Sequence, residues 1–142
     1  GTRRKVMKVK DIMARDVATL GLNDELSLAD DIMKLGRIRN LPVVEEGRLV
    51  GIISQRDLFK ASLASAMGFG EKAKREFMKT VAVKEVMVDE VITVSPEADI
   101  EEAGRVMLEK KIGCLPVIEG DNLVGLITET DILRYYVEPK GR

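Results

Sequence analysis

Histidine and tryptophan are absent from this chain of 142 residues, and Cys114 is its only cysteine. Without histidine there is no Ser-His-Asp triad, and a single cysteine excludes an intrachain disulfide and a Cys/His zinc site. Aromatic residues make up only 4% of the sequence, so a run of aromatics on which nucleic-acid bases could stack is missing as well. Much of enzyme chemistry is thereby excluded, and we expect neither a catalytic centre nor a metal site.

Long hydrophobic stretches are also missing, since no run approaches the ~18–20 apolar residues that a membrane span needs. The first residues, Gly1–Lys5, do not lead into the hydrophobic segment of a secretory signal. The 23 basic and 24 acidic residues nearly cancel, and the apolar content of 45% is typical of a globular protein. We expect a cytoplasmic protein that contacts no membrane.

The sequence contains the same unit twice. A shift of 74 residues places 9–60 on 83–134 without a gap, and 17 of the 52 aligned pairs are identical. Leu-Pro-Val-Val-Glu at 41–45, for example, falls on Leu-Pro-Val-Ile-Glu at 115–119. The agreement continues through expected strands, turns and helices alike, which indicates a duplication.

Each copy is predicted to have the order β-α-β-β-α after a short lead segment. Apolar positions at helical spacing predict the helices, and two apolar runs around an acidic, glycine-containing turn predict a hairpin. The expected elements of the first copy are a strand at 17–20, a helix at 25–36, hairpin strands at 41–44 and 48–53, and a helix at 55–66. The matching strand and helices of the second copy are expected at 91–94, 99–110 and 129–137.

These elements predict an α/β protein of the α+β type with two small domains, 7–66 and 81–138, joined by a linking helix within 67–80. Neither copy is long enough to bury much core alone. We therefore expect the copies to pack sheet to sheet about a pseudo-twofold axis, with two symmetry-related clefts where the sheets meet.

The most informative motif is Ser54-Gln-Arg-Asp57, which recurs as Thr128-Glu-Thr-Asp131. Each follows a Gly-containing strand and begins a helix. One interpretation is a capping box, in which the hydroxyl and the carboxylate each accept a hydrogen bond from a backbone amide of the first turn. The other is a ligand site. A helix N-terminus favours phosphate, and an ionised aspartate can accept hydrogen bonds from two ribose hydroxyls.

The glycines of these strands, Gly51 and Gly125, would let a ligand or a neighbouring backbone approach closely. The paired copies, with Leu-Pro-Val before the hairpin and Gly-φ-φ-Ser/Thr-x-x-Asp after it (φ, apolar), resemble two CBS domains in tandem, the Bateman module. The likeness covers about residues 7–138. Such modules bind adenosine nucleotides or related adenosyl ligands between the paired domains and act as sensors.

The resemblance implies that Asp57 and Asp131 bind ribose, and that Ser54 and Thr128 lie on the phosphate side. One site would join Thr128, Thr130 and Asp131 to Thr19, Ile38 and Arg39. The other would join Ser54, Arg56 and Asp57 to Thr93, Ile112 and Gly113. Arg37, Arg39 and Arg56 make the first copy the more cationic of the two, and an arginine can grip phosphate in a bidentate manner or remain a solvated charge.

We therefore expect a non-catalytic regulatory module that binds an adenine nucleotide and signals through its conformation or through dimerisation. The expected partners are a second copy of the chain, in a homodimer, and an effector protein. AMP, ADP or ATP are the expected ligands, followed by NAD, S-adenosylmethionine and cyclic dinucleotides, and no prosthetic group is expected. Two alternatives stay open. The chain could be a ligand-free interaction scaffold, or it could bind nucleic acid through a basic arm formed by Arg3, Arg4, Lys5, Lys8 and Lys10.

Overall fold

The computed structural model describes residues 6–66 and 70–138. The chain divides into two compact units. Residues 18–91 form the first-repeat unit, and residues 1–17 together with 92–142 form the second-repeat unit. Arg3, Arg4 and Lys5 of the expected basic arm, and the first residues of the expected linking segment, lie outside the described residues.

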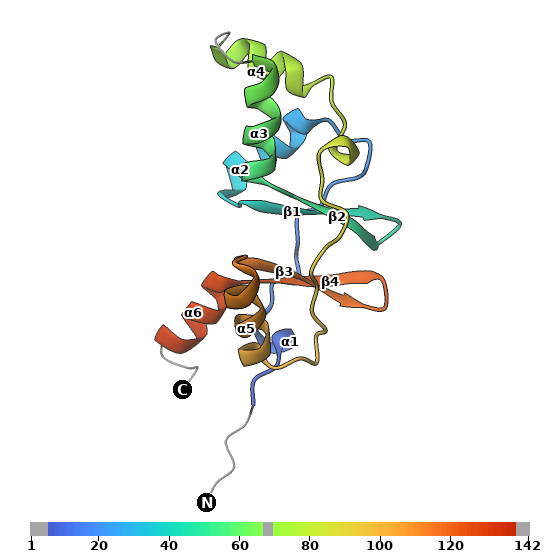
Figure 1. Ribbon diagram of the computed structural model, residues 1–142. Helices are drawn as coiled ribbons and strands as arrows, with labels where there is room; N and C mark the ends of the chain where they lie inside the picture. The colour runs from blue at the N-terminus through green and yellow to red at the C-terminus, as the bar shows by residue number, and fades with distance from the viewer. Residues whose placement is uncertain (1–5, 67–69, 139–142) are drawn as a thin grey trace, which may run out of the picture. The chain divides into compact units, whose positions relative to one another are not determined.

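The first-repeat unit has two helices on one side of an antiparallel hairpin (Figure 1). Its elements are α2 (Leu26–Gly36), β1 (Asn40–Glu45), β2 (Arg48–Ser54), α3 (Gln55–Ala66), α4 (Gly70–Met78) and a short 3-10 helix (Val83–Glu85). Alternate apolar residues of the strands and the inner faces of the helices form its core, in which Leu41 and Ile53 are fully buried.

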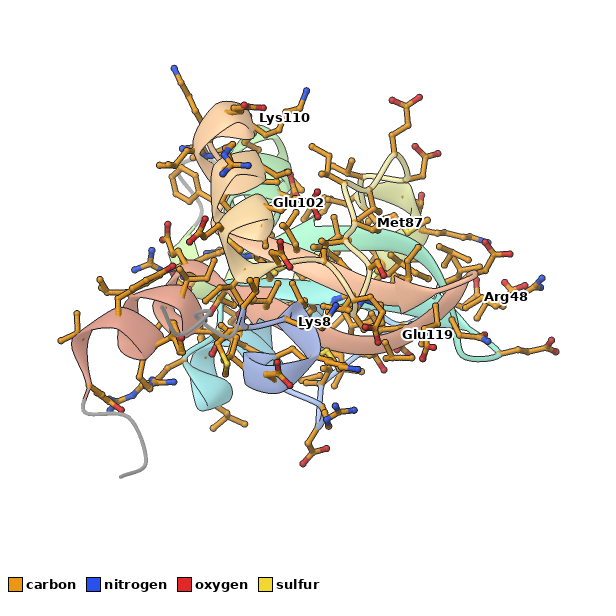
Figure 2. The ribbon with its side chains drawn as sticks, turned by 90° about the horizontal axis from the view of Figure 1, so that it is seen from below. Lys8, Arg48, Met87, Glu102, Lys110 and Glu119 are labelled. Atoms are coloured by element: carbon orange, nitrogen blue, oxygen red, sulfur yellow. The ribbon has the colours of Figure 1, made fainter. Side chains whose placement is uncertain are left out.

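The second-repeat unit has the same arrangement. Its elements are α1 (Val9–Ile12), α5 (Ile100–Lys110), β3 (Cys114–Glu119), β4 (Asn122–Thr128) and α6 (Glu129–Val137). Arg48 begins β2 and Glu119 ends β3, so each lies beside the turn of its own hairpin, as Figure 2 shows. The prediction of an α+β protein built from two repeats is therefore confirmed.

The expected first strands, at 17–20 and 91–94, are reduced to isolated bridges. Leu20 pairs in parallel with Val43, and Val94 pairs in parallel with Val117. Only one residue of each segment joins the hairpin, because the chain then turns away to begin α2 or α5.

The lead segment of each repeat packs in the unit of the other repeat. In the second-repeat unit, the Val9 amide donates to the Ala98 carbonyl at 2.8 Å, and Ala14 and Leu126 exchange two backbone hydrogen bonds of 2.9 Å. In the first-repeat unit, Ile52 and Val88 exchange a matching pair of 2.9 Å. Each lead segment thus completes the core of the unit that contains the hairpin of the other repeat.

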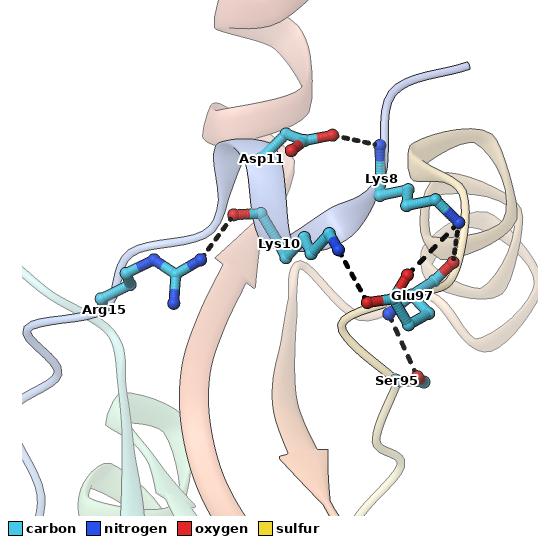
Figure 3. Close-up of polar contacts among 6 residues, drawn as sticks. All are labelled: Lys8, Lys10, Asp11, Arg15, Ser95 and Glu97. Atoms are coloured by element: carbon cyan, nitrogen blue, oxygen red, sulfur yellow. Dashed lines mark hydrogen bonds and ion pairs between the residues drawn. The ribbon is translucent and has the colours of Figure 1, made fainter. Parts of the chain in front are cut away.

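An ionic cluster holds the lead segment containing α1 (Figure 3). Lys10 Nζ lies 2.8 Å from Glu97 Oε1, and Lys8 Nζ lies 3.4 Å from Glu97 Oε2. The hydrogen bond from Lys10 is the largest cause of a lowered pKa at Glu97.

Within residues 6–66 and 70–138, no helix is long and apolar enough to cross a bilayer.

Candidate functional site

The Ser/Thr-x-x-Asp motifs lie at the starts of α3 and α6, and both form complete capping boxes. The Thr128 amide donates to Asp131 Oδ2 at 2.8 Å, and the Asp131 amide donates to Thr128 Oγ1 at 3.3 Å. At the start of α3, the corresponding distances between Ser54 and Asp57 are 2.8 and 3.1 Å. The capping interpretation is therefore confirmed as geometry.

Capping employs only one oxygen of each aspartate. The bonded atom is Oδ2 in both boxes, and Oδ1 takes no part in the cap. Asp131 Oδ1 lies 3.8 Å from Arg134 Nη1, a long and weak ion pair, and the Asp131 side chain keeps 17% of its surface exposed. The cap thus fixes the orientation of a carboxylate whose second oxygen can still accept hydrogen bonds.

The residues before each hairpin are tied to the start of the following helix. The Gln55 amide donates to the Arg39 carbonyl at 2.8 Å, and the Glu129 amide donates to the Gly113 carbonyl at 2.9 Å. Ile38 and Arg39 therefore lie beside the first turn of α3. The equivalent residues before β3 lie beside the first turn of α6 in the same way.

The two threonines predicted from the first strands lie at the same end of their units. Thr19 precedes Leu20, whose amide donates to the Pro42 carbonyl at 3.0 Å. Because the bridge is parallel, Thr19 runs beside the first residues of β1, and β1 begins at Asn40, the partner of Ser54. Thr93 has the corresponding place in the second-repeat unit.

Each unit thus gathers six of the twelve predicted residues at one end. The first-repeat unit holds Thr19, Ile38, Arg39, Ser54, Arg56 and Asp57, and the second-repeat unit holds Thr93, Ile112, Gly113, Thr128, Thr130 and Asp131. Each ligand site is predicted to combine residues of both repeats, and that grouping stays a prediction.

The two groups differ in charge. Arg39 and Arg56 are exposed at the start of α3. Glycine replaces Arg39 in the second repeat, and a Cβ on Gly113 would lie 3.0 Å from the Glu129 carboxylate. Glu129 was not among the residues predicted from sequence, although its place directly after Thr128 was the available signal. The first group is cationic, whereas the second is acidic.

The in-strand glycines accommodate the lead segments. A Cβ on Gly51 would lie 3.1 Å from the Val88 carbonyl oxygen, and a Cβ on Gly125 would lie 2.9 Å from that of Ala14. Met87 and Met13 also press on these positions with their side chains. Of the two alternatives, ligand or neighbouring backbone, the structure therefore supports the backbone.

Cys114 begins β3 and is buried, with 6% of its surface exposed. Burial, aided by the negative charge of Asp131, raises the pKa of its thiol to about 12. Such a thiol is an inert core residue rather than a nucleophile. Among the described residues, no three His, Cys, Asp or Glu side chains cluster in a way that could hold a metal ion.

Comparison with known proteins agrees with the repeat. The sequence model of the CBS domain matches residues 9–64 and again 83–138. A solved structure of a putative acetoin utilization protein (AcuB) from Vibrio cholerae is 35% identical, with a TM-score of 0.79 over 94% of this chain and 92% of that one. The CBS domain pair of protein MJ0100 is 30% identical, with a TM-score of 0.76 over 93% and 97% of the two chains.

Inosine-5'-monophosphate dehydrogenase of Thermoplasma acidophilum is 34% identical over 92% of this chain. The aligned part is only 24% of that enzyme, and the chain likewise spans 33% of the next curated relative. The likeness is thus to a part of these longer proteins. With two copies of the family's domain over most of its length, the chain belongs to the CBS domain family and is a tandem CBS pair.

Proposed function

We propose that this CBS pair is a non-catalytic regulatory module that reversibly binds an adenosine-type ligand at the starts of α3 and α6. The observation that carries the proposal is that only one of the two carboxylate oxygens of each aspartate takes part in the cap. Asp57 and Asp131 are each held by a backbone amide through Oδ2, while Oδ1 stays outside the cap. An oriented carboxylate oxygen beside a helix N-terminus suits the adjacent ribose and phosphate of a nucleotide.

The residues around each aspartate have complementary roles. In the first-repeat unit, Arg39 and Arg56 supply positive charge for phosphate, and Ile38 is an apolar neighbour for a base. In the second-repeat unit, Glu129 disfavours phosphate near Gly113. The expected order of ligands, with AMP, ADP and ATP before NAD, S-adenosylmethionine and cyclic dinucleotides, comes from the resemblance to CBS pairs. The positive charge of Arg39 and Arg56 supports a ligand that carries phosphate.

A relative supports the adenosyl part of the proposal. The MJ0100 pair was solved in complex with 5'-methylthioadenosine and S-adenosyl-L-methionine. Both aspartates and both hydroxyls of the proposed site are present in this chain, which supports the same ligand class here. Fold alone does not determine the ligand.

The module itself carries out no reaction in this proposal. The dehydrogenase relative aligns over only 24% of its length, so its activity gives no reason to assign catalysis to this chain. Ligand binding instead shifts the population of two arrangements of the module, and a cytoplasmic effector protein or a second copy detects the shift. Exposed apolar side chains such as Leu35 and Phe59 support association of two copies.

The test is a thermal-shift and calorimetric titration of the full chain with AMP, ADP, ATP, S-adenosylmethionine and 5'-methylthioadenosine. A ligand at 100 times its dissociation constant adds ~2.7 kcal/mol of stability. Asp57→Ala and Asp131→Ala should each weaken binding by about tenfold or more, since each removes a charge-assisted hydrogen bond.

Matched controls separate ligand binding from capping. Asp24 accepts from the Gly21 amide at 2.7 Å in the first-repeat unit, and Asp11 accepts from the Lys8 amide at 2.9 Å in the second. Asp24→Ala and Asp11→Ala remove a similar bond outside the proposed site, and they should leave the affinity unchanged. Equal loss in the control and site variants would disprove the assignment.

A ligand-free scaffold is the second candidate, because both capping boxes are complete without a ligand. It predicts that none of the five ligands raises the unfolding temperature. A nucleic-acid arm receives less support, since Lys8 and Lys10 are both paired with Glu97. It predicts a steep loss of affinity with rising salt.

A further inference from the structure

Met87 holds the lead segment of the second repeat against the hairpin of the first-repeat unit (Figure 2). This lead segment comprises residues 83–88, and its Val88 exchanges two backbone hydrogen bonds of 2.9 Å with Ile52 of β2. The Met87 sulfur lies beside Gly51, where it fills the space that a side chain on this glycine would need. The contact therefore depends on a flexible, apolar side chain that lies directly on the backbone of a strand.

The sulfur of Met87 is also within reach of small molecules from solvent. Met87 is partly exposed, as is Met7, whereas four other methionines keep 8% or less of their surface exposed, namely Met13, Met33, Met78 and Met107. Met13 is the counterpart of Met87 under the 74-residue shift, and its sulfur lies beside Gly125 in the same manner. The two repeats thus share one packing arrangement but differ in access to the sulfur.

The two lead segments also differ in what else holds them. In the segment that contains α1, Lys8 and Lys10 are paired with Glu97. The 74-residue shift places Ala82 at the position of Lys8 and Asn23 at the position of Glu97, and neither side chain can form an ion pair. The accessible sulfur therefore belongs to the lead segment without the ionic cluster, so its methionine contact contributes a larger share of the docking.

A thioether at this position can react with hydrogen peroxide. The sulfur lone pair attacks one peroxide oxygen, an S–O bond forms as the O–O bond breaks, and the departing hydroxide accepts the proton of the transferred OH group. The thioether is oxidised to a sulfoxide, and the peroxide is reduced to water. The product is polar, and the space beside Gly51 is also bordered by the Val88 carbonyl oxygen, an acceptor that can donate no hydrogen bond to it.

We propose that Met87 is a reversible oxidation site, at which a peroxide converts the side chain to methionine sulfoxide and releases residues 83–88 from β2. A sulfoxide oxygen buried against strand backbone without a donor makes the docked arrangement less stable. Release breaks the pair between Ile52 and Val88, two residues before Ser54, at which β2 ends. This inference goes beyond ligand binding and does not depend on it.

The experiment oxidises the full chain and follows each methionine separately. Met67, which lies outside the described residues, is replaced by leucine in every sample, so that only the six described methionines remain. After timed exposure to hydrogen peroxide, peptide mass spectrometry gives the oxidation rate at each sulfur. Met87 should react about tenfold faster or more than its buried counterpart Met13, because oxidation follows exposure.

Hydrogen exchange then reports whether the lead segment is released. In the oxidised protein, the amides of Ile52 and Val88 should exchange roughly tenfold faster. The amides of Ala14 and Leu126, the matching pair in the second-repeat unit, should be unchanged. Treatment with the two methionine sulfoxide reductases, one for each sulfoxide epimer, should restore slow exchange.

Substitutions assign the effect to one sulfur. Met87→Leu removes the thioether at nearly constant volume, so peroxide should leave exchange at Ile52 and Val88 slow. Met7→Leu is the matched control, because it removes the other partly exposed methionine and should leave the response to peroxide intact. Met87→Glu places acceptor oxygens at the same position, and it should speed exchange at Ile52 and Val88 without any oxidant.

Four results would overturn the proposal. These are equal oxidation rates at Met87 and Met13, unchanged exchange at Ile52 and Val88 once Met87 is oxidised, a response to peroxide that persists in Met87→Leu, and slow exchange in Met87→Glu. Faster exchange in the second-repeat unit to the same extent would also contradict it, because oxidation would then loosen the whole protein rather than release one lead segment.

Discussion

Thr128 and Asp131 hold each other at the start of α6 through three hydrogen bonds, of 2.8, 3.0 and 3.3 Å. The pair satisfies two backbone amides of the first turn that have no partner within the helix. It also orients the carboxylate that the proposed ligand would contact. One pair of side chains thus contributes to stability and to the candidate site, so a substitution has to be measured for both.

Thr128→Ala should lower the free energy of unfolding by about 1 kcal/mol, because it removes the N-cap hydroxyl. Thr130→Ala is the control, since this exposed neighbour lies in the same first turn and makes no part of the cap. Urea unfolding followed by circular dichroism gives both values. If the two variants were equally stable, the capping bonds would contribute nothing measurable.

The helices and hairpins were predictable from sequence because each appears twice with a clear period. Apolar residues at helical spacing locate α2 and α5, and the duplicated Leu-Pro-Val fixes β1 and β3. The strands at 17–20 and 91–94 were overpredicted. Both segments are mostly apolar, but only Leu20 and Val94 find a partner, and pairing depends on tertiary packing that local sequence does not encode.

Two features of the candidate site lay beyond sequence reasoning. The motif Ser/Thr-x-x-Asp predicts a cap equally well with or without a ligand, so sequence could not choose between them. The exchange of lead segments explains Gly51 and Gly125, and it brings together residues such as Ala14 and Leu126 that lie far apart in the chain. Periodicity carries no information about which unit a segment joins.

Gly125→Ala should destabilise the protein by about 1–3 kcal/mol, because the new methyl group would press on the Ala14 carbonyl and on Met13. Gly104→Ala should do the opposite. The nearest atom to its new methyl group is Ile132 Cδ1, at an ordinary 3.7 Å, and alanine favours the interior of α5 by ~1 kcal/mol. Chemical denaturation gives the change in the free energy of unfolding for each variant, and the two changes should have opposite signs. Destabilisation of similar size in both variants would contradict the close approach at Gly125.

Glu97→Gln should loosen the lead segment that contains α1, because it removes the negative charge with which Lys8 and Lys10 form ion pairs. Hydrogen exchange at the amides of Val9 and Lys10, which donate to carbonyls at 96 and 98, should become faster. The effect should shrink at high salt because the cluster is exposed. Acid should reproduce it. The pKa of Glu97 is lowered by these lysines, so its contribution is present above the ordinary carboxyl pKa and is lost as the pH falls through the lowered value.

The control for this cluster is Glu76→Gln, which removes an exposed ion pair with Lys79 beside α4. It should leave exchange at Val9 and Lys10 unchanged. Faster exchange at these two amides in both variants, or in neither, would show that the ionic cluster does not hold the lead segment.

Cys114 should make the free energy of unfolding decrease as the pH rises above 9. Burial raises the pKa of its thiol to about 12 from an ordinary 9.0, so above pH 9 the unfolded chain releases a proton that the folded protein keeps. This contribution is complete below pH 9 and is lost as the pH rises toward 12, with a loss of roughly 1 kcal/mol already at pH 10. Lysines and tyrosines titrate in the same range, so the quantity to measure is the difference in slope between the native chain and Cys114→Ala in urea unfolding from pH 8 to 10. Parallel slopes, or rapid reaction of the folded protein with a thiol reagent at pH 8, would show that the thiol is accessible and its pKa ordinary.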